Sequence, residues 1–523
     1  MGRYFLMTIL GLLVGMPQVV AQGSSLEELD ASYFDWFNKD PKADKVAGIS
    51  LDKVYNKLLK GKTPEKTVLV AVIDSGVDIE HEDLEGKIWI NEDEVAANGI
   101  DDDGNGYIDD IHGWNFLGNS NGENVQYENL EETRIVAESD NKDPLFASAK
   151  ASYDEQLEEN RQFRDNISAF VEVYQEAKKI VQDATGVEVK SIEDLEKVSS
   201  DREDVEYAVQ FLRGRFELGL TDDYVQAAVE YSIEYMDYYL EPGLNARDII
   251  GDDPTDITDR NYGNPDVRGP DATHGTGVAG TIAAIRGNGI GINGVTEFVK
   301  IMPVRAVPQG DERDKDVALA IRYAVDNGAD IINMSFGKNF SPQKSFVDDA
   351  VRYAEEKGVL LVHASGNDGR NIDESDNFPT SIYADGKKAS HWLEIGANSR
   401  DFDESIAASF SNYGKQQVDL FAPGASIVTL DLDNTYSSHD GTSFAAPITS
   451  GVAALILAYY SQATPQELIQ VLTSSVMPVK KPKLVMQPTE EGDPMEVSFG
   501  DLSGSGGILN AYQAMKTAKK TFK

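Results

Sequence analysis

The feature that most constrains the fold is an alternation of short apolar segments with longer amphipathic ones. The apolar segments are rich in Val, Ile and Leu, and each stops at a polar or glycine-containing turn. This alternation is typical of an α/β protein, in which a parallel sheet is flanked by helices on both faces. Sites in such sheets form at the carboxyl ends of the strands. We expect strands at 68–73, 300–307, 330–334, 358–362, 392–396 and 418–422, and helices at 316–327, 342–357 and 443–459.

The segment 438–447 places Ser443 between a glycine turn and the first turn of an apolar helix. We expect Pro447 in the first turn of that helix, where its missing N–H costs nothing. The backbone N–H of Ser443 has no partner within the helix, so it can bind an oxyanion. A hydroxyl is a weak nucleophile and needs a base elsewhere in the chain. The simpler interpretation of Ser443 is an ordinary helix cap.

Two further segments can supply such a base and its partner. The apolar run that starts at Val68 stops at Asp74, and the segment 271–280 places His274 at the head of a helix of small residues. Each has a simple alternative, as a turn residue or a capping histidine. The chain has only six histidines, however, and together these residues supply a nucleophile, a base and the group that orients the base.

These three segments resemble the active-site motifs of the subtilisin-like serine proteases, over residues 65–120 and 261–515. The resemblance implies a subtilisin-like three-layer fold and an Asp74–His274–Ser443 catalytic triad. It also implies that Asn367 is the side-chain donor of an oxyanion hole, paired with the Ser443 N–H. By the same resemblance, two segments bind an extended peptide as an added strand, and they contain Ser335, Phe336, Gly337, Ala364, Ser365 and Gly366.

Departures from the family pattern occur beside the triad. Gly277 stands where many members have a second histidine, and Phe444 stands where many have methionine. Neither is catalytic by the triad argument, so we expect them to affect the shape of the pocket. Two other functions stay open: a pseudoprotease that only binds peptides, and an esterase. The Gly-x-Ser-x-Gly motif of many esterases is absent around Ser443.

The composition limits the location and the partners of the protein. Residues 1–21 have the pattern of a secretory signal peptide, with one arginine, an apolar run and small residues before a cleavage point. We therefore expect an extracytoplasmic protein, periplasmic or secreted. The chain has no cysteine and hence no disulfide, and its formal net charge of −42 argues against nucleic acid and anionic membranes as partners. We expect a monomer that acts on peptides or proteins.

The order of segments predicts a catalytic domain that is interrupted once. We expect an N-terminal arm at 22–64, catalytic parts at 65–120 and 261–523, and a mostly helical, acidic insertion at 121–260. The insertion holds half of the net negative charge of the chain. Four tyrosines in it, at 231, 235, 238 and 239, share one face of a helix. The insertion either restricts access to the cleft or is a peripheral decoration, and the sequence leaves both open.

A glycine-rich acidic loop predicts a calcium site. Oxygen ligands fall at positions 1, 3, 5, 7 and 9 of a loop similar to that of an EF-hand, although His112 stands where an EF-hand has its glutamate. A solvated acidic turn is the alternative. The ligands are the side chains of Asp101, Asp103, Asn105 and Asp109 and the carbonyl of Tyr107. The family resemblance implies a second calcium site, at Asp83 and Asn288.

Overall fold

The computed structural model describes residues 24–26, 29–139, 142–489 and 494–522. The predicted signal peptide lies outside these residues. The described chain divides into two compact units. We call residues 24–131 and 245–522 the sheet unit and residues 132–244 the helical unit. Each is described by itself.

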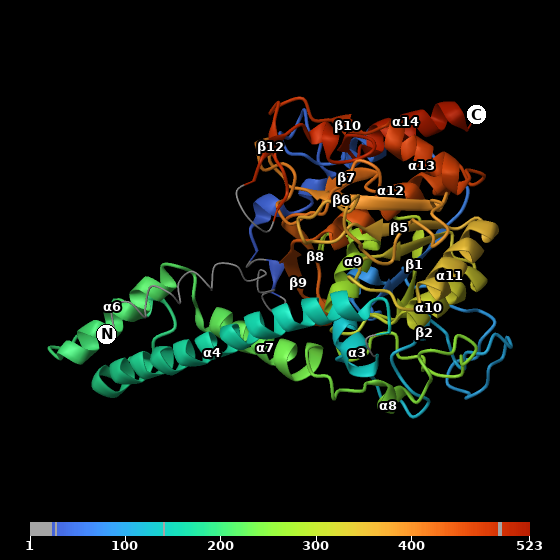
Figure 1. Ribbon diagram of the computed structural model, residues 1–523. Helices are drawn as coiled ribbons and strands as arrows, with labels where there is room; N and C mark the ends of the chain where they lie inside the picture. The colour runs from blue at the N-terminus through green and yellow to red at the C-terminus, as the bar shows by residue number, and fades with distance from the viewer. Residues whose placement is uncertain (1–23, 27–28, 140–141, 490–493, 523) are drawn as a thin grey trace. The chain divides into compact units, whose positions relative to one another are not determined.

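A nine-stranded sheet forms the centre of the sheet unit, in the order β10-β13-β7-β6-β5-β4-β1-β3-β2. All neighbouring strands are parallel except β10 and β13. The predicted parallel sheet is therefore confirmed (Figure 1). The strands are β1 (Val68–Asp74), β2 (Trp114–Asn115), β3 (Val299–Arg305), β4 (Ile331–Met334), β5 (Leu360–Ala364), β6 (Trp392–Asn398), β7 (Leu420–Pro423), β10 (Met477–Pro478) and β13 (Gly507–Ile508).

Helices cover both faces of this sheet, because alternate residues of each strand point to opposite sides. In β1, Val70 and Val72 belong to the apolar cluster that contains α9 (Thr273–Ala283) and α12 (Thr442–Tyr459). Ala71 and Ile73 belong to a second cluster, with α10 (Asp314–Asp326) and α11 (Lys344–Lys357). The strands are accordingly apolar on both faces, as in other parallel sheets. The predicted three-layer α/β fold is confirmed.

Several expected strands have different ends in the structure, and for β3 and β5 the reasons are identifiable. Gly358 cannot begin β5, because it closes α11 in a left-handed conformation with φ of +78°. β3 ends at Arg305 because its neighbour β1 ends at Asp74, and the N–H groups of the next two residues both donate to the Asp74 carbonyl.

Shorter elements complete the sheet unit. A capping box formed by Thr464 and Glu467 begins α13 (Pro465–Ser474). The remaining helices and turns are η2 (Ala31–Tyr33), η3 (Trp36–Asn38), α2 (Leu51–Lys53), η4 (Val54–Leu59), η5 (Glu82–Leu84), α8 (Arg247–Ile250), η7 (Leu432–Asn434), η8 (Phe499–Asp501) and α14 (Ala511–Thr521). Two small antiparallel pairs are β8 (Ile427–Leu430) with β9 (Tyr436–His439), and β11 (Val485–Met486) with β12 (Glu496–Val497).

The N-terminal arm is part of the core of the sheet unit. Trp36, Phe37, Ile49 and Leu51 are at most 1% exposed. All four belong to the same apolar cluster as α12. The arm thus contributes to the stability of this unit rather than forming a separate segment.

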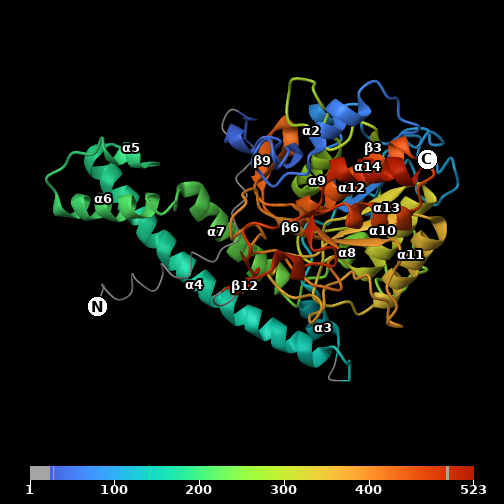
Figure 2. The ribbon, with the colours of Figure 1, turned by 90° about the horizontal axis from the view of Figure 1, so that it is seen from above.

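The helical unit has its own apolar core, in which α6 and α7 pack along the long helix α4 (Figure 2). Its bounds, 132–244, lie inside the predicted range of 121–260. Three of the predicted tyrosines are in ring contact, Tyr231 with Tyr235 and Tyr235 with Tyr239. Phe163 of α4 packs edge-on against Tyr231. The helices are α3 (Glu131–Glu138), α4 (Phe146–Thr185), α5 (Ile192–Leu195), α6 (Glu203–Phe216), α7 (Asp222–Glu234) and the π-helical turn η6 (Tyr235–Tyr239).

Buried ion pairs hold the chain at both points where it leaves and re-enters the sheet unit. Before the helical unit, Glu131 forms an ion pair with Lys338, with 2.6 Å between Oε2 and Nζ. After it, Arg247 pairs with Asp316 of α10, and both side chains are at most 5% exposed. A buried pair of this kind is costly to break, because the remaining charge has no partner.

Candidate active site

Asp74 and His274 meet at the carboxyl end of the sheet. Asp74 is the last residue of β1, and His274 lies in the first turn of α9. Their side chains are joined by a 2.7 Å hydrogen bond between His274 Nδ1 and Asp74 Oδ1. Glycine at 275 permits this approach, since a Cβ there would lie 2.0 Å from the Gly76 carbonyl oxygen.

The surroundings of this pair favour a basic, accessible imidazole. Burial lowers the pKa of His274, but the charge and hydrogen bond of Asp74, together with the charge of Asp271, raise it above 6.5 overall. Asp74 is 1% exposed, whereas the His274 side chain is 39% exposed. The imidazole is thus fixed by a buried carboxylate on one side and open to a ligand on the other.

Ser443 lies in the first turn of α12, and a contact between rings links this turn to His274. The ring of Phe444 packs edge-on against the His274 imidazole, with 5.7 Å between centroids. The hydrogen bonds of the described residues include none between Ser443 Oγ and His274 Nε2. Such catalytic hydrogen bonds are often long or poorly aligned without substrate. The helix and the imidazole are nevertheless neighbours, as the predicted triad requires.

Asn367 has a fixed orientation beside Ser443. Its Oδ1 accepts hydrogen bonds from both the N–H and the hydroxyl of Thr442, at 2.9 and 2.8 Å. The NH₂ group must therefore face the other way. A Cβ added at Gly441 would lie 3.5 Å from both Asn367 Nδ2 and Ser443 Oγ. The amide donor and the serine hydroxyl thus border the same small space.

The two predicted substrate-binding segments lie at the ends of adjacent strands. Residues 335–337 follow β4, and residues 364–366 include the end of β5. Pro447 lies inside α12, beyond the first turn in which it was expected, so the Ser443 carbonyl lacks its helical N–H partner. The Ser335 hydroxyl donates to this carbonyl at 2.8 Å and so supports the serine turn. Gly337 is exposed, and none of the backbone hydrogen bonds found in the described residues involves it. Its peptide groups are available to another strand.

Two residues of this site, Thr442 and His439, were not predicted from the sequence. Thr442 orients Asn367, and only the Gly-Thr-Ser pattern could have indicated it. The ring of His439 is stacked on that of Phe444 with 4.9 Å between centroids. Burial and the charge of His274 lower the pKa of His439 to about 4. His439 is therefore a neutral ring behind Phe444 near neutral pH.

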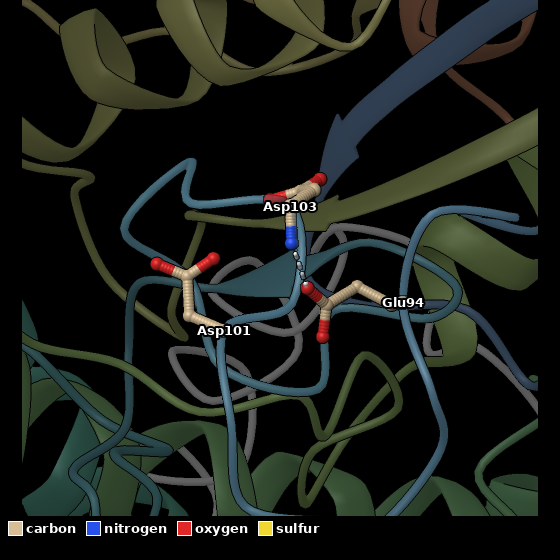
Figure 3. A group of neighbouring side chains, drawn as sticks. All are labelled: Glu94, Asp101 and Asp103. Atoms are coloured by element: carbon tan, nitrogen blue, oxygen red, sulfur yellow. Dashed lines mark hydrogen bonds between the residues drawn. The ribbon is translucent and has the colours of Figure 1, made fainter.

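The predicted calcium loop brings together three carboxylates, two of which the sequence indicated. Ligand oxygens of Glu94, Asp101 and Asp103 lie within 4.8 Å of one another (Figure 3). Glu94 precedes the loop, and its Oε1 accepts the Asp103 N–H at 3.2 Å. Asp109 faces elsewhere, because its carboxylate accepts the N–H groups of residues 98 and 99. Asn105 Oδ1 accepts the Tyr107 N–H at 2.7 Å, which closes the turn between them.

Asp83 and Asn288, the second predicted calcium pair, are in contact. Asn288 Nδ2 donates to Asp83 Oδ1 at 2.7 Å, and Asp83 is fully buried. Burial raises the pKa of Asp83. The Tyr436 hydroxyl nearby is buried without a hydrogen-bond partner among the described residues. A Cβ at Gly291 would lie 2.7 Å from this hydroxyl and 1.9 Å from Asp83 Oδ2.

Comparison with known proteins gives the family. The profile of the subtilase family matches residues 65–500, which is most of the chain. The protein therefore belongs to the subtilase family. The matched range contains Asp74, His274, Asn367 and Ser443, so the geometry above lies within the family domain.

Curated relatives agree with this family. The chain is 37% identical over 219 residues to the thermophilic serine proteinase of Bacillus sp. (strain AK1), covering 42% of this chain and 49% of the relative. It is 34% identical over 212 residues to the thermostable alkaline protease of Halalkalibacterium halodurans, covering 40% and 54%. The chain thus spans about half the length of these relatives. The solved prenylagaramide maturation protease PagA is 28% identical over 47% of this chain and 82% of its own, with a TM-score of 0.38, which is too low to carry a conclusion.

One helix within the described residues is long and apolar enough to cross a membrane. It is α12, which carries Ser443, and 94% of its apolar window is buried inside the protein. Its apolar character is accounted for by its place in the core of the sheet unit.

Proposed function

We propose that this protein is a secreted serine endopeptidase that hydrolyses peptide bonds through Asp74, His274 and Ser443. The observation that carries this proposal is the 2.7 Å bond between His274 Nδ1 and Asp74 Oδ1. It sets the imidazole at the end of the sheet where α12 begins. A carboxylate that orients a histidine beside a helix-borne serine is the arrangement of a hydrolytic triad.

In this mechanism, Ser443 Oγ attacks the carbonyl carbon of the scissile bond. His274 Nε2 takes the hydroxyl proton and later gives it to the leaving amine. Asp74 keeps the proton of His274 on Nδ1 and stabilises the imidazolium that forms. Water then hydrolyses the acyl-enzyme by the same steps in reverse order. The burial of Asp74 and its hydrogen bond to His274 support this role of Asp74.

The oxyanion of the tetrahedral intermediate would be held by Asn367 Nδ2 and the Ser443 N–H. The orientation of Asn367 by Thr442 supports this role, because it leaves only the NH₂ group facing the serine. Donors that are oriented in advance stabilise the transition state without reorganising, and one such donor is worth roughly 3–4 kcal/mol of barrier.

The substrate would be a peptide or protein in extended conformation. The segments 335–337 and 364–366 would pair with its backbone, and the exposed peptide groups of Gly337 are suited to this. We further propose an extracytoplasmic location, periplasmic or secreted, and a monomeric enzyme that does not bind nucleic acid or membranes. The signal-like residues 1–21 and the net charge of −42 support these proposals.

Calcium would have a structural role at two places. The carboxylates of Glu94, Asp101 and Asp103 repel one another at the separation found, and a divalent cation would relieve that repulsion. The buried Asp83, with Asn288 and the unpaired Tyr436 hydroxyl, is a second set of hard oxygen donors. Neither place takes part in the chemistry proposed for Ser443.

A fluorophosphonate probe tests the proposal directly, because it reacts only with an activated serine. We expect stoichiometric labelling at Ser443, located by mass spectrometry. We expect no labelling of Ser443→Ala, and strongly slowed labelling of His274→Ala. A protein that binds peptides but leaves the probe unreacted would be a pseudoprotease.

A further inference from the structure

His363 is a fully buried histidine for which the proposed reaction has no use. It lies on β5, and both of its ring nitrogens are bonded. Nε2 is 2.8 Å from the Phe336 carbonyl oxygen, and Nδ1 is 2.8 Å from Glu394 Oε1. A carbonyl oxygen can only accept, so Nε2 carries the hydrogen and donates it to Phe336. A carboxylate oxygen of Glu394 also accepts, so both bonds form when Nδ1 carries a hydrogen too and donates it to Glu394.

This bond joins the two predicted substrate-binding segments to each other. His363 immediately precedes residues 364–366, whereas Phe336 is the central residue of 335–337. The two segments extend neighbouring strands, with Met334 of β4 opposite His363. The imidazole is thus a cross-link between the two walls of the proposed substrate site.

Two residues of β6, Glu394 and Trp392, hold the His363 imidazole in place. Glu394 is 3% exposed, and its second carboxylate oxygen accepts the indole N–H of Trp392 at 2.7 Å. The Trp392 ring also packs against His363, with 5.2 Å between centroids. A carboxylate that accepts the hydrogen of one ring nitrogen fixes the orientation of the ring, and the other nitrogen stays a donor when it carries a hydrogen as well, as in an imidazolium–carboxylate pair.

The direction of the Phe336 carbonyl determines where the next peptide N–H points. In a trans peptide, the carbonyl of Phe336 and the N–H of Gly337 lie in one plane and point in opposite directions. Since the carbonyl points at the buried His363, the Gly337 N–H points away from it. Gly337 is exposed and takes part in none of the backbone hydrogen bonds found in the described residues, so a peptide strand can pair with this N–H.

We propose that His363, oriented by Glu394, is a positioning residue that sets the Phe336–Gly337 peptide plane for an incoming peptide backbone. This inference rests on the proposed function, in that residues 335–337 bind an extended substrate. It gives His363 no part in bond cleavage. Without the imidazole donor the peptide plane can rotate, and ordering it costs free energy when the peptide binds.

The test separates binding from catalysis by using the Ser443→Ala background. Calorimetry measures the dissociation constant of an extended hexapeptide for two proteins, the Ser443→Ala variant and the Ser443→Ala, His363→Phe double variant. Phenylalanine at 363 keeps a ring but removes the hydrogen-bond donor. We expect binding to weaken about 10-fold, as for the loss of one hydrogen bond at a bound backbone. In the Ser443-intact enzyme, KM for the peptide should rise while hydrolysis of p-nitrophenyl acetate stays within about 2-fold, because the small ester needs only the triad and the oxyanion hole.

Matched variants separate positioning from loss of stability. Glu394→Gln should retain near wild-type peptide affinity, because its amide can donate to Nδ1 and keep the hydrogen on Nε2. Glu394→Ala should weaken the affinity. Leu361→Ala, a fully buried position on the same strand, should lower Tm without weakening peptide binding.

The peptide affinities of these variants can overturn the inference. Unchanged peptide affinity in His363→Phe overturns the inference, as does an equal loss in Leu361→Ala. If His363→Phe does not fold, the two Glu394 variants decide, and equal affinities for them overturn it. Failure of the intact enzyme to react with a fluorophosphonate would refute the proposed chemistry, while the affinities in the Ser443→Ala background still test His363.

Discussion

Thr442 orients Asn367: its N–H and its hydroxyl both donate to Asn367 Oδ1, at 2.9 and 2.8 Å. The hydroxyl of Thr442 also accepts the Gly366 N–H at 3.1 Å. The residue before Ser443 thus connects the serine turn to the strand end that carries Asn367. The NH₂ group of Asn367 is left as the donor for an oxyanion, although Asn367 itself is exposed.

Replacing Thr442 should therefore reduce turnover, although Thr442 acts through Asn367 and does not itself contact the substrate. Thr442→Val keeps the shape and the backbone donor but removes the hydroxyl, so we expect kcat to fall about 10-fold with KM nearly unchanged. Asn367→Ala should lower kcat by about 10²–10³. Steady-state kinetics on one peptide measures both. A KM effect larger than the kcat effect in Asn367→Ala would assign this residue to substrate binding instead.

The pH dependence of kcat/KM should report the His274 base. The imidazole must be neutral to accept a proton, so activity should be lost as the pH falls through the His274 pKa, which lies above 6.5. The charge of Asp271 helps to raise that pKa. Asp271→Asn should consequently shift the acid limb to lower pH. A shift to higher pH, or none, would contradict this account of the electrostatics.

The Asp74–His274 pair should also make the stability of the fold depend on pH. The direction is opposite to that of activity, because stability falls as the pH rises. The raised pKa of His274 means that the folded state binds the proton more tightly than the unfolded state does. The stability contributed by the protonated pair is fully present below the unfolded pKa of histidine, near 6.5, and is lost as the pH rises through the folded value. Comparing urea unfolding of the wild type and His274→Gln between pH 5 and 9 should show this difference. Parallel profiles would rule it out.

Calcium should stabilise the folded chain by mass action. We expect Tm to fall on chelation, and to recover with Ca²⁺ but poorly with Mg²⁺. Asp101→Ala combined with Asp103→Ala should blunt this response, and so should Glu94→Gln. Glu92→Gln, at an exposed position two residues from Glu94, is the matched control and should respond like the wild type. An identical melting curve in chelator would reduce the loop to a surface turn.

Breaking the ion pair at the return from the helical unit should be costly. Arg247→Met removes the cation paired with the buried Asp316 and leaves it only the hydrogen bond from the Tyr262 hydroxyl. We expect a loss of about 3–5 kcal/mol in the free energy of unfolding. Lys179→Met removes an exposed i,i+4 pair with Asp183 and should cause no measurable change. Equal effects in urea unfolding would contradict the structural importance of the buried pair.

Much of this arrangement could be predicted from the sequence, because local patterns determine it. The apolar run ending at Asp74 and the glycine turn before Ser443 indicated a strand end and a helix start. Contacts between distant segments left no such pattern. Glu94 precedes the calcium loop, and the role of His363 depends on Phe336, which follows β4, and on Glu394 of β6.

The burial of the N-terminal arm and the role of the insertion also depend on contacts between distant segments, which the sequence does not reveal. The arm reads as polar, yet Trp36 and Phe37 are buried in the core, because burial depends on tertiary packing rather than on average composition. Restriction of access to the cleft by the insertion stays a prediction.

The most direct test of the central claim is turnover by Ser443→Ala. The purified wild type and variant are compared on the same extended peptide, with circular dichroism to show that both are folded. The triad predicts that kcat falls by on the order of 10⁶, leaving the residual catalysis of binding and the oxyanion hole. Turnover by the variant at the wild-type rate would contradict the assignment of Ser443 as the nucleophile.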